Sequence, residues 1–215
     1  MLYTIIVLIK LINAIQSSYL MYRITDLLLL TLLSLILIPL FAITLLLAKI
    51  LHKKNIFFVQ KRVGREKNVF NLYKFRSMVE NAETMGTGLY SFEDDIRITS
   101  FGKFLRKTSL DELPQLINVL KGDMSFVGPR PSVVGELDRE QGLPANVDDR
   151  FSVRPGLTGW AQINGRDSIS WAEKARLDLE YISFPRWKRS IINIFIVFYT
   201  PLYLLNFRVI SESQS

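Results

Sequence analysis

The sequence predicts a mostly helical, membrane-associated protein of the α/β class, α+β-like in its organisation. Three observations predict this class. Leu27–Ala48 is a run of 22 residues without a charge, which indicates a membrane helix. Two short runs, residues 56–60 and 69–73, are typical of strands. Farther along, apolar residues recur at helical spacing. With 215 residues, the chain has the length of one domain with an appended segment.

Composition narrows the chemistry that the chain can carry. It has no cysteine and a single histidine, His52, which excludes thiolate chemistry and disfavours a Ser-His-Asp triad or a histidine-rich metal centre. Acid–base or nucleophilic work then falls to carboxylates, Lys, Tyr or Ser, and Mg²⁺ is the metal that best suits oxygen ligands. The net charge of +7 suits anionic lipid, nucleic acid or phosphorylated substrates.

Residues 1–22 are interpreted as an N-terminal extension. Lys10, Asn13 and Gln16 interrupt its apolar character, and no small-residue cleavage site marks it as a signal peptide. Met21 offers an alternative start, in which case the residues before it are not native.

The uncharged run that follows is long enough to cross a membrane, since a straight helix of this length extends about 33 Å. Pro39 near its middle is expected to kink the helix. Arg23 precedes the run and Lys49 follows it, so the positive-inside rule gives no direction. A single span and a kinked re-entrant helix, which returns to the leaflet it entered, both remain open.

The segment from Lys49 to Arg76 is strongly basic. Nine of its residues are Lys or Arg and only Glu66 is acidic. It contains the two predicted strands, joined by a loop with Gly64. The positive charge favours adhesion to anionic headgroups, and Lys74 or Arg76 could contact a phosphate. Nucleic acid is the less economical partner, because an apolar segment adjoins this one.

Two adjacent carboxylates, Asp111 and Glu112, stand at the predicted start of a helix that ends at Gly122. Ser109 and Glu112 fit a Ser-x-x-Glu capping box. In this interpretation both carboxylates lie in the first turn, where the helix dipole holds them ionised and attracts phosphate. Pro114 favours a later start of the helix. The alternative role of the two carboxylates is to cap the helix and nothing more.

Arg130 stands between two prolines, Pro129 and Pro131. Prolines on both sides hold the backbone extended and stiff. A rigidly presented guanidinium suits a phosphate or a planar base, and the alternative is an ordinary surface turn.

The remaining segments are predicted more simply. Residues 80–100 are polar and predict a loop. Residues 154–166 contain three glycines, which mark turns or a close approach of the backbone to something bound, and lack the ending of a P-loop. Residues 170–181 predict a helix that carries Asp178. The apolar residues 191–205 predict a helix that lies in the membrane interface or packs into the core.

Five motifs follow one another in order between about Tyr22 and about Tyr181. They are Tyr73-Lys74-Phe75-Arg76-Ser77-Met78, Ser109-Leu110-Asp111-Glu112-Leu113-Pro114-Gln115, Asn118-Val119-Leu120-Lys121-Gly122-Asp123-Met124-Ser125, Gly128-Pro129-Arg130-Pro131 and Arg154-Pro155-Gly156-Leu157-Thr158-Gly159. Their ordered combination resembles the bacterial sugar transferase family, the monotopic phosphoglycosyl transferases.

The resemblance implies a reaction. Members of the family transfer a sugar-1-phosphate from a UDP-sugar to undecaprenyl phosphate and release UMP at the cytoplasmic face of the bacterial inner membrane. This step starts the assembly of a capsule, O-antigen, exopolysaccharide or glycoprotein glycan. The implied partners are the UDP-sugar, undecaprenyl phosphate, inner-membrane lipids and downstream glycosyltransferases, with no nucleic acid. The alternative is a membrane-anchored basic adaptor that binds anionic lipid and does no chemistry.

The resemblance also implies a fold: a re-entrant membrane helix broken at Pro39, a small catalytic domain and interfacial amphipathic helices. Many members have Ser before that proline, where this chain has Ile38. The chain is similar to the minimal form of the family. We therefore expect an extension at 1–22, a membrane helix at 23–52, a catalytic domain at 53–189 and an interfacial helix with a tail at 190–215.

By position, Asp111 resembles the family's nucleophile and metal ligand, and Glu112 resembles its partner in the dyad. The residues expected to bind substrate are Lys74, Arg76, Arg106, Arg130, Arg166 and Asp178. An aspartate nucleophile would form an acyl phosphate and divide one displacement into two. The implied cofactor, Mg²⁺, would offset the repulsion between the carboxylate and the diphosphate.

Overall fold

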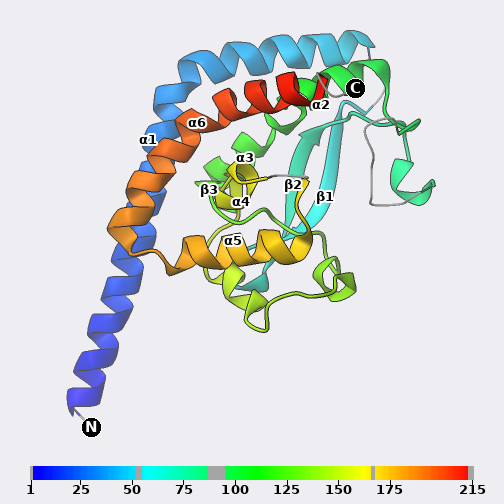
Figure 1. Cartoon of the computed structure of the whole chain (residues 1–215). Coiled ribbons are helices and arrows are strands. Elements are labelled where there is room, and N and C mark those ends of the chain that lie inside the picture. Colours follow the sequence, from blue (N-terminus) through cyan, green and yellow to red (C-terminus); the bar gives the residue numbers. More distant parts are fainter. Residues whose placement is uncertain (1, 52–54, 87–94, 166–167, 213–215) are drawn as a thin grey trace.

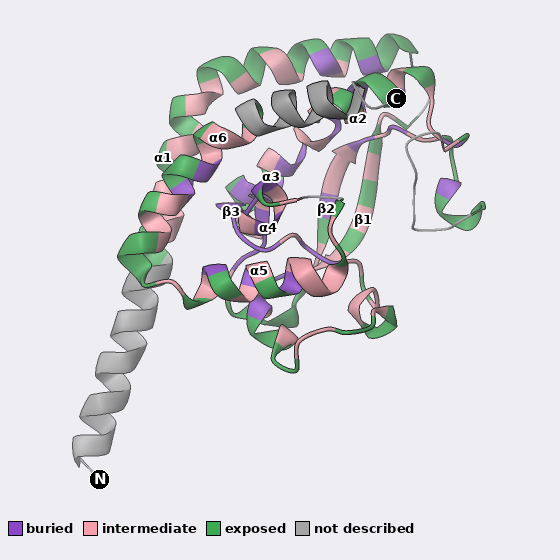
Figure 2. Ribbon diagram, viewed as in Figure 1, coloured by how far each residue is buried: buried purple, intermediate pink, exposed green. Residues whose placement is uncertain are grey.

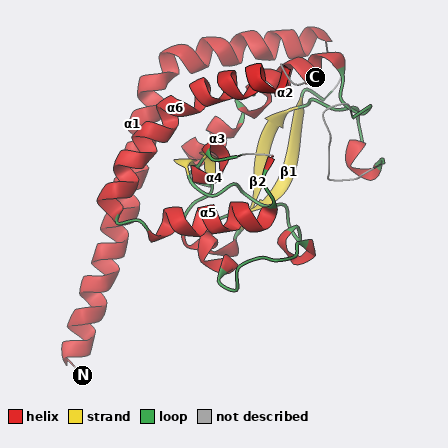
Figure 3. Cartoon of the chain, in the orientation of Figure 1, coloured by secondary structure: helices red, strands yellow, loops and turns green. Residues whose placement is uncertain are grey.

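The computed structural model describes residues 2–51, 55–86, 95–165 and 168–212, and within these ranges the side chains of residues 20–201. Helices make up most of the described chain, and two two-stranded sheets lie among them (Figure 3). The predicted class, a mostly helical protein with small sheets, is confirmed at this level.

The first helix, α1, spans Leu2–Leu51. Its Leu20–Leu51 part is long and apolar enough to cross a membrane, with a mean hydropathy of 2.7, and Leu35 on it is 84% exposed. So large an exposed apolar surface indicates membrane association. Pro39 lies inside the helix, which changes direction in its second half (Figure 1). The predicted break at Pro39 is not confirmed, because α1 bends but continues as one helix.

Pro39 divides α1 into two arms, and both arms pack against the same body, by which we mean the folded part of the chain that follows α1. Before Pro39, Leu29 and Leu33 pack against the main hydrophobic core. After Pro39, Phe41 packs against a second, smaller core cluster, in which Ala48 is fully buried. Figure 2 accordingly shows buried positions on both arms, within a helix that is otherwise largely exposed.

Polar side chains of α1 also anchor it to the body. Arg23 donates to backbone carbonyls at the end of α3 (Gln115–Lys121). Asp26, only 3% exposed, accepts from Ser125 Oγ at 2.7 Å and from Phe126 N at 3.0 Å. Its other oxygen pairs with Arg154 Nη2 at 3.1 Å. A buried carboxylate on the membrane helix is thus held by two hydrogen bonds on one oxygen and by an ion pair on the other.

The first sheet is the predicted hairpin. Strands β1 (Phe57–Val63) and β2 (Val69–Phe75) pair antiparallel; each is two residues longer than expected, and β1 begins one residue later. The buried Asn118 of α3 holds this sheet, because its side chain accepts from Tyr73 N at 3.1 Å and donates to Asn71 O at 2.7 Å. Asn118 thereby fixes β2 beside α3.

The second sheet joins two distant segments. Strands β3 (Ser125–Val127) and β4 (Gly156–Thr158) pair in parallel, and α4 (Trp160–Ile163) follows. A Cβ at Gly156 would stand 2.1 Å from Gly128 N, and one at Gly159 would stand 2.2 Å from Gly128 O. The close approach predicted for these glycines is therefore an approach to the protein's own backbone.

The last two helices cover the body. The predicted helix at 170–181 is confirmed as α5 (Trp171–Ser183), with Ser170 Oγ accepting from Glu173 N at its start. Helix α6 (Arg186–Glu212) buries Ile196 and exposes large side chains such as Trp187, at 69%. It therefore packs into the core by one face and leaves an apolar face outward; the placement of that face in a membrane interface stays a prediction.

Candidate active site

The two adjacent carboxylates lie in a short 3₁₀ turn, Leu110–Glu112, between α2 (Ser100–Thr108) and α3. Ser109 has a φ of 56° and ends α2, with its N–H directed to carbonyls of the preceding turn. The predicted capping box is therefore wrong, because Ser109 serves the helix before it. Helix α3 begins at Gln115 after Pro114, as the proline favoured, and ends at Gly122 as predicted.

Asp111 is buried, with 7% of its surface exposed. Burial raises the pKa of Asp111 above that of an ordinary aspartate, and the neighbouring Glu112 raises it further. The positive charges of Lys74, Arg106 and Arg130 act in the opposite direction on this pKa. A buried carboxylate whose pKa is raised by burial and lowered by nearby cations is typical of a reacting group.

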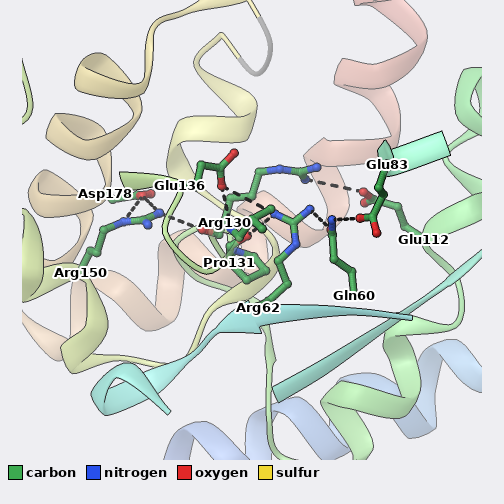
Figure 4. A network of polar contacts seen from close by, with 10 residues as sticks. Gln60, Arg62, Glu83, Glu112, Arg130, Pro131, Glu136, Arg150 and Asp178 are labelled. Atoms are coloured by element: carbon green, nitrogen blue, oxygen red, sulfur yellow. Dashed lines mark hydrogen bonds and ion pairs between the residues drawn. The ribbon is translucent and has the colours of Figure 1, made fainter. Parts of the chain in front are cut away.

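Glu112 is held by two cations from separate parts of the chain. Lys74 Nζ, on β2, lies 2.9 Å from Glu112 Oε1. Arg130 Nη1, in the segment after β3, lies 3.6 Å from the same oxygen (Figure 4). Both predicted substrate-binding cations therefore reach the dyad directly.

Arg106 approaches from the last turn of α2. Its Nε donates to Ser77 Oγ at 2.9 Å. Burial lowers the pKa of Arg106, and the nearby Asp111 carboxylate opposes that effect. Three cations from β2, α2 and the segment after β3 thus surround the dyad.

The other predicted residues lie elsewhere. Arg76 donates to the backbone oxygens of Asn55 at 2.7 Å and Phe57 at 3.4 Å. Arg166 falls outside the described residues. Asp178 of α5 is 2% exposed and pairs with Arg150 at 2.8 Å, and burial raises the pKa of Asp178 while Arg150 lowers it.

Sequence reasoning missed two arginines that support the site. Arg62 Nη1, on β1, donates to Pro131 O at 2.9 Å, and Arg150 Nη2 donates to Arg130 O at 2.8 Å (Figure 4). A charged side chain on the partly buried side of a strand was a usable signal for Arg62. Arg150 offered none, because it lies in a polar stretch without a motif.

A pocket of about 280 Å³, including its open mouth, lies beside Arg130. Trp171, Lys174, Asp178 and Gln162 are among its lining residues. The amide nitrogen and oxygen of Gln162 are both buried and have no hydrogen-bond partner within the described part of the chain. Such unpaired polar atoms leave donor and acceptor capacity for a ligand.

The implied metal ion fits a limited set of ligands here. Among the described residues, no group of three or more His, Cys, Asp or Glu side chains could enclose a metal ion. Asp111 and Glu112 supply two carboxylates. Because Mg²⁺ is commonly held by one or two carboxylates together with substrate phosphates, the dyad fits an ion that arrives with a diphosphate.

The fold and the site define a class: a membrane-associated, mostly helical protein with small sheets, in which an acidic dyad with a buried Asp111 lies among three cations. The particular family follows from comparison of sequences. The chain belongs to the bacterial sugar transferase family, whose model matches residues 17–206. The predicted resemblance is confirmed, and the match extends beyond the Tyr22–Tyr181 range on which it rested.

Relatives with descriptive names agree with this family. The chain is 48% identical over 127 residues to the uncharacterized sugar transferase EpsL of Bacillus subtilis, covering 59% of this chain and 60% of that protein. It is 41% identical over 170 residues to the UDP-glucose:undecaprenyl-phosphate glucose-1-phosphate transferase of Escherichia coli, covering 76% of this chain and 36% of that protein. It is 36% identical over 176 residues to the exopolysaccharide production protein ExoY of Sinorhizobium fredii, covering 75% of each. The chain thus spans less than two thirds of the first two.

Proposed function

We propose that this protein is a phosphoglycosyl transferase that moves a sugar-1-phosphate from a UDP-sugar to undecaprenyl phosphate and releases UMP. The observation that carries the proposal is the buried Asp111 beside Glu112, with Lys74, Arg106 and Arg130 contributed by three separate elements. The names of the relatives from Escherichia coli and Sinorhizobium fredii support the donor, the acceptor and a role in polysaccharide assembly.

The reaction divides into two displacements on one phosphorus atom. In the first, an oxygen of Asp111 attacks the phosphorus that carries the sugar, and the bond from that phosphorus to UMP breaks. In the second, an oxygen of undecaprenyl phosphate attacks the same phosphorus, and the bond to Asp111 breaks. Two displacements through a covalent aspartyl intermediate replace one displacement between two anions.

The chain's own cations make these displacements feasible. Lys74 and Arg130 hold Glu112 and stand beside the carboxylate that attacks, so a diphosphate at Asp111 would meet positive charge from several sides. An arginine can also bind two phosphate oxygens with its planar fork. Bound Mg²⁺, held by Asp111 with Glu112 close by, would supply further charge neutralisation of the diphosphate.

The placement at the membrane suits a lipid acceptor. Leu29 and Phe41, on opposite sides of Pro39, pack against one body, so both ends of the apolar segment belong on the same side of the bilayer. This supports a re-entrant helix rather than a straight span. We place the body at the cytoplasmic face of the bacterial inner membrane, where it would meet a UDP-sugar, the acceptor's phosphate and downstream glycosyltransferases.

The test is release of UMP by the purified protein in lipid nanodiscs with undecaprenyl phosphate, Mg²⁺ and a panel of UDP-sugars. Release is expected with at least one sugar, and Asp111→Asn should abolish it. Asp138→Asn, at an exposed aspartate, is the matched control and should retain it. Full turnover by Asp111→Asn would exclude the nucleophile, and binding to anionic vesicles without any UMP would favour the adaptor.

Topology has its own test, because the chain has no cysteine. Single cysteines at Ile24 and Asn55 would be labelled in sealed inverted vesicles and in intact spheroplasts with a membrane-impermeant maleimide. The re-entrant arrangement predicts that both positions react from the cytoplasmic side. Labelling from opposite sides would establish a span.

A further inference from the structure

Four consecutive backbone carbonyl groups, from Pro129 to Ser132, each accept a hydrogen bond, and the donors come from three parts of the chain. The acceptors are the backbone oxygens of residues 129–132. Their donors, in order, are Gly156 N at 2.9 Å, Arg150 Nη2 at 2.8 Å, Arg62 Nη1 at 2.9 Å and Val63 N at 2.9 Å. The outer two donors are backbone groups, and the inner two are arginine side chains.

The two arginine side chains supply hydrogen-bond donors to carbonyls in a segment where the backbone offers few. Pro129 and Pro131 have no N–H, so this segment cannot form an ordinary strand ladder on both sides of Arg130. Buried carbonyls need donors. A guanidinium offers several donors on one planar group, and it can therefore reach a carbonyl and still bind an acidic or amide partner.

Both arginines are themselves held in place. The side chain of Arg62 is 14% exposed, and its Nη2 donates to Gln60 Oε1 at 2.6 Å while Nη1 lies 3.9 Å from Glu136 (Figure 4). Arg150 is 2% exposed and donates to Asp178 Oδ2 from Nε at 3.2 Å and from Nη2 at 2.8 Å. Burial and the charge of Arg130 lower the pKa of Arg62 to about 10, so it remains protonated at neutral pH.

We propose that Arg62 and Arg150 are positioning residues that fix the backbone of the Pro129–Pro131 segment and so aim Arg130 at the dyad. Asp178 then acts through Arg150, as the group that orients it. The consequence for the reaction is geometric. Arg130 is 3.6 Å from Glu112, and a shift of its backbone would move the guanidinium away from the phosphate it is meant to meet. This inference rests on the proposed function for its effect on turnover, but not for its effect on backbone order.

Backbone order can be measured without any substrate. A nitroxide on a single cysteine at position 130 of this cysteine-free chain, read by electron paramagnetic resonance in nanodiscs, reports local mobility. Arg62→Gln and, separately, Asp178→Asn should each increase that mobility. Lys61→Gln removes the neighbouring, exposed cation of β1 and should leave the spectrum unchanged. Unchanged spectra for both support-residue variants would overturn the proposal.

The link to catalysis is tested by a double-mutant cycle on UMP release. Arg62→Gln should lower kcat/KM by about 10–10²-fold while Arg130 is present, the scale expected for a misplaced group. In an Arg130→Ala background it should cost no more than roughly threefold, because the group it positions is gone. Arg62→Lys keeps a positive charge and a hydrogen-bond donor, so it should recover part of the lost kcat/KM. No such recovery is expected if the loss in Arg62→Gln came only from the change in side-chain volume.

Each result has one meaning. Melting temperatures are recorded for all variants, and if Arg62→Gln fails to fold, Asp178→Asn carries both measurements. Equal losses with and without Arg130 would show that Arg62 acts independently and would refute the positioning role. If the wild type released no UMP with any sugar, the proposed function would fail, while the spin-label spectra would still decide whether Arg62 and Asp178 order the segment.

Discussion

Asp26 links the membrane helix to the body of the protein, and its removal should lower stability substantially. Its carboxylate is the acceptor for Ser125 Oγ at 2.7 Å and Phe126 N at 3.0 Å, and pairs with Arg154 at 3.1 Å. The side chains of Asp26 and Arg154 are 5% and 6% exposed. In Asp26→Ala the buried Arg154 would lose this carboxylate, and removing one member of a buried ion pair costs about 3–5 kcal/mol. The two lost hydrogen bonds belong to the same cluster and should not add in full.

This cost predicts a large change in melting temperature. For a chain of this size, 1 kcal/mol corresponds to about 2–4 °C, so Asp26→Ala should lower the melting temperature in nanodiscs by roughly 6–20 °C. Thr31→Val removes a hydroxyl that donates to Leu27 O of the same helix; it is the matched control and should change little. The paired change Asp26→Leu with Arg154→Met should be less destabilised than Asp26→Leu alone, because both members of the buried ion pair are replaced together. A loss for Asp26→Ala no larger than that of Thr31→Val would refute the reasoning.

Three further changes test the site and its support. Gly102→Ala should destabilise by about 1–3 kcal/mol in denaturant unfolding, because a Cβ there would stand 1.8 Å from Ser77 O; an unchanged midpoint would contradict this packing. Lys74→Met should lower kcat for UMP release by about 10²–10³-fold, because Glu112 loses its 2.9 Å partner; a loss confined to KM would argue for binding alone. Burial raises the pKa of Asp111 above 3.8, so kcat/KM should fall as pH drops through that raised value and the nucleophile is protonated. The stability effect of the same group has the opposite sign, being present at low pH and lost as pH rises through that value; a rate unchanged down to about pH 4 would exclude a perturbed aspartate.

Local patterns predicted the parts of the fold that depend on local causes. The uncharged Leu27–Ala48 run, the hairpin and helix α5 follow from period and composition. The prediction for Ser109 was wrong because this residue lies between two helices. The Ser-x-x-Glu spacing indicated a cap for the helix that follows, whereas its left-handed backbone ends α2, the helix that precedes it. A local window does not reveal which neighbour a cap serves.

The sequence predicted the charged residues of the site but not the residues that hold the segment of Arg130 in place. Asp111, Glu112, Lys74 and Arg130 meet as the motifs implied. The donors that hold the segment of Arg130 come from positions 20 and 69 residues away from their acceptors, and such pairings leave no periodic trace. Asp178 was predicted from its position in the motif pattern, yet its partner Arg150 was not.

The attachment of α1 at two places has a consequence for building chimeras of this family. Because α1 contacts the body on both sides of its bend, no boundary within the helix allows one protein's membrane segment to be exchanged for another's without changing these contacts. A donor helix without an acid at position 26 would remove the ion pair with Arg154, and one of different shape after the bend would not pack against the core cluster that contains Ala48. A working exchange would therefore have to carry the facing residues of the body along with the helix.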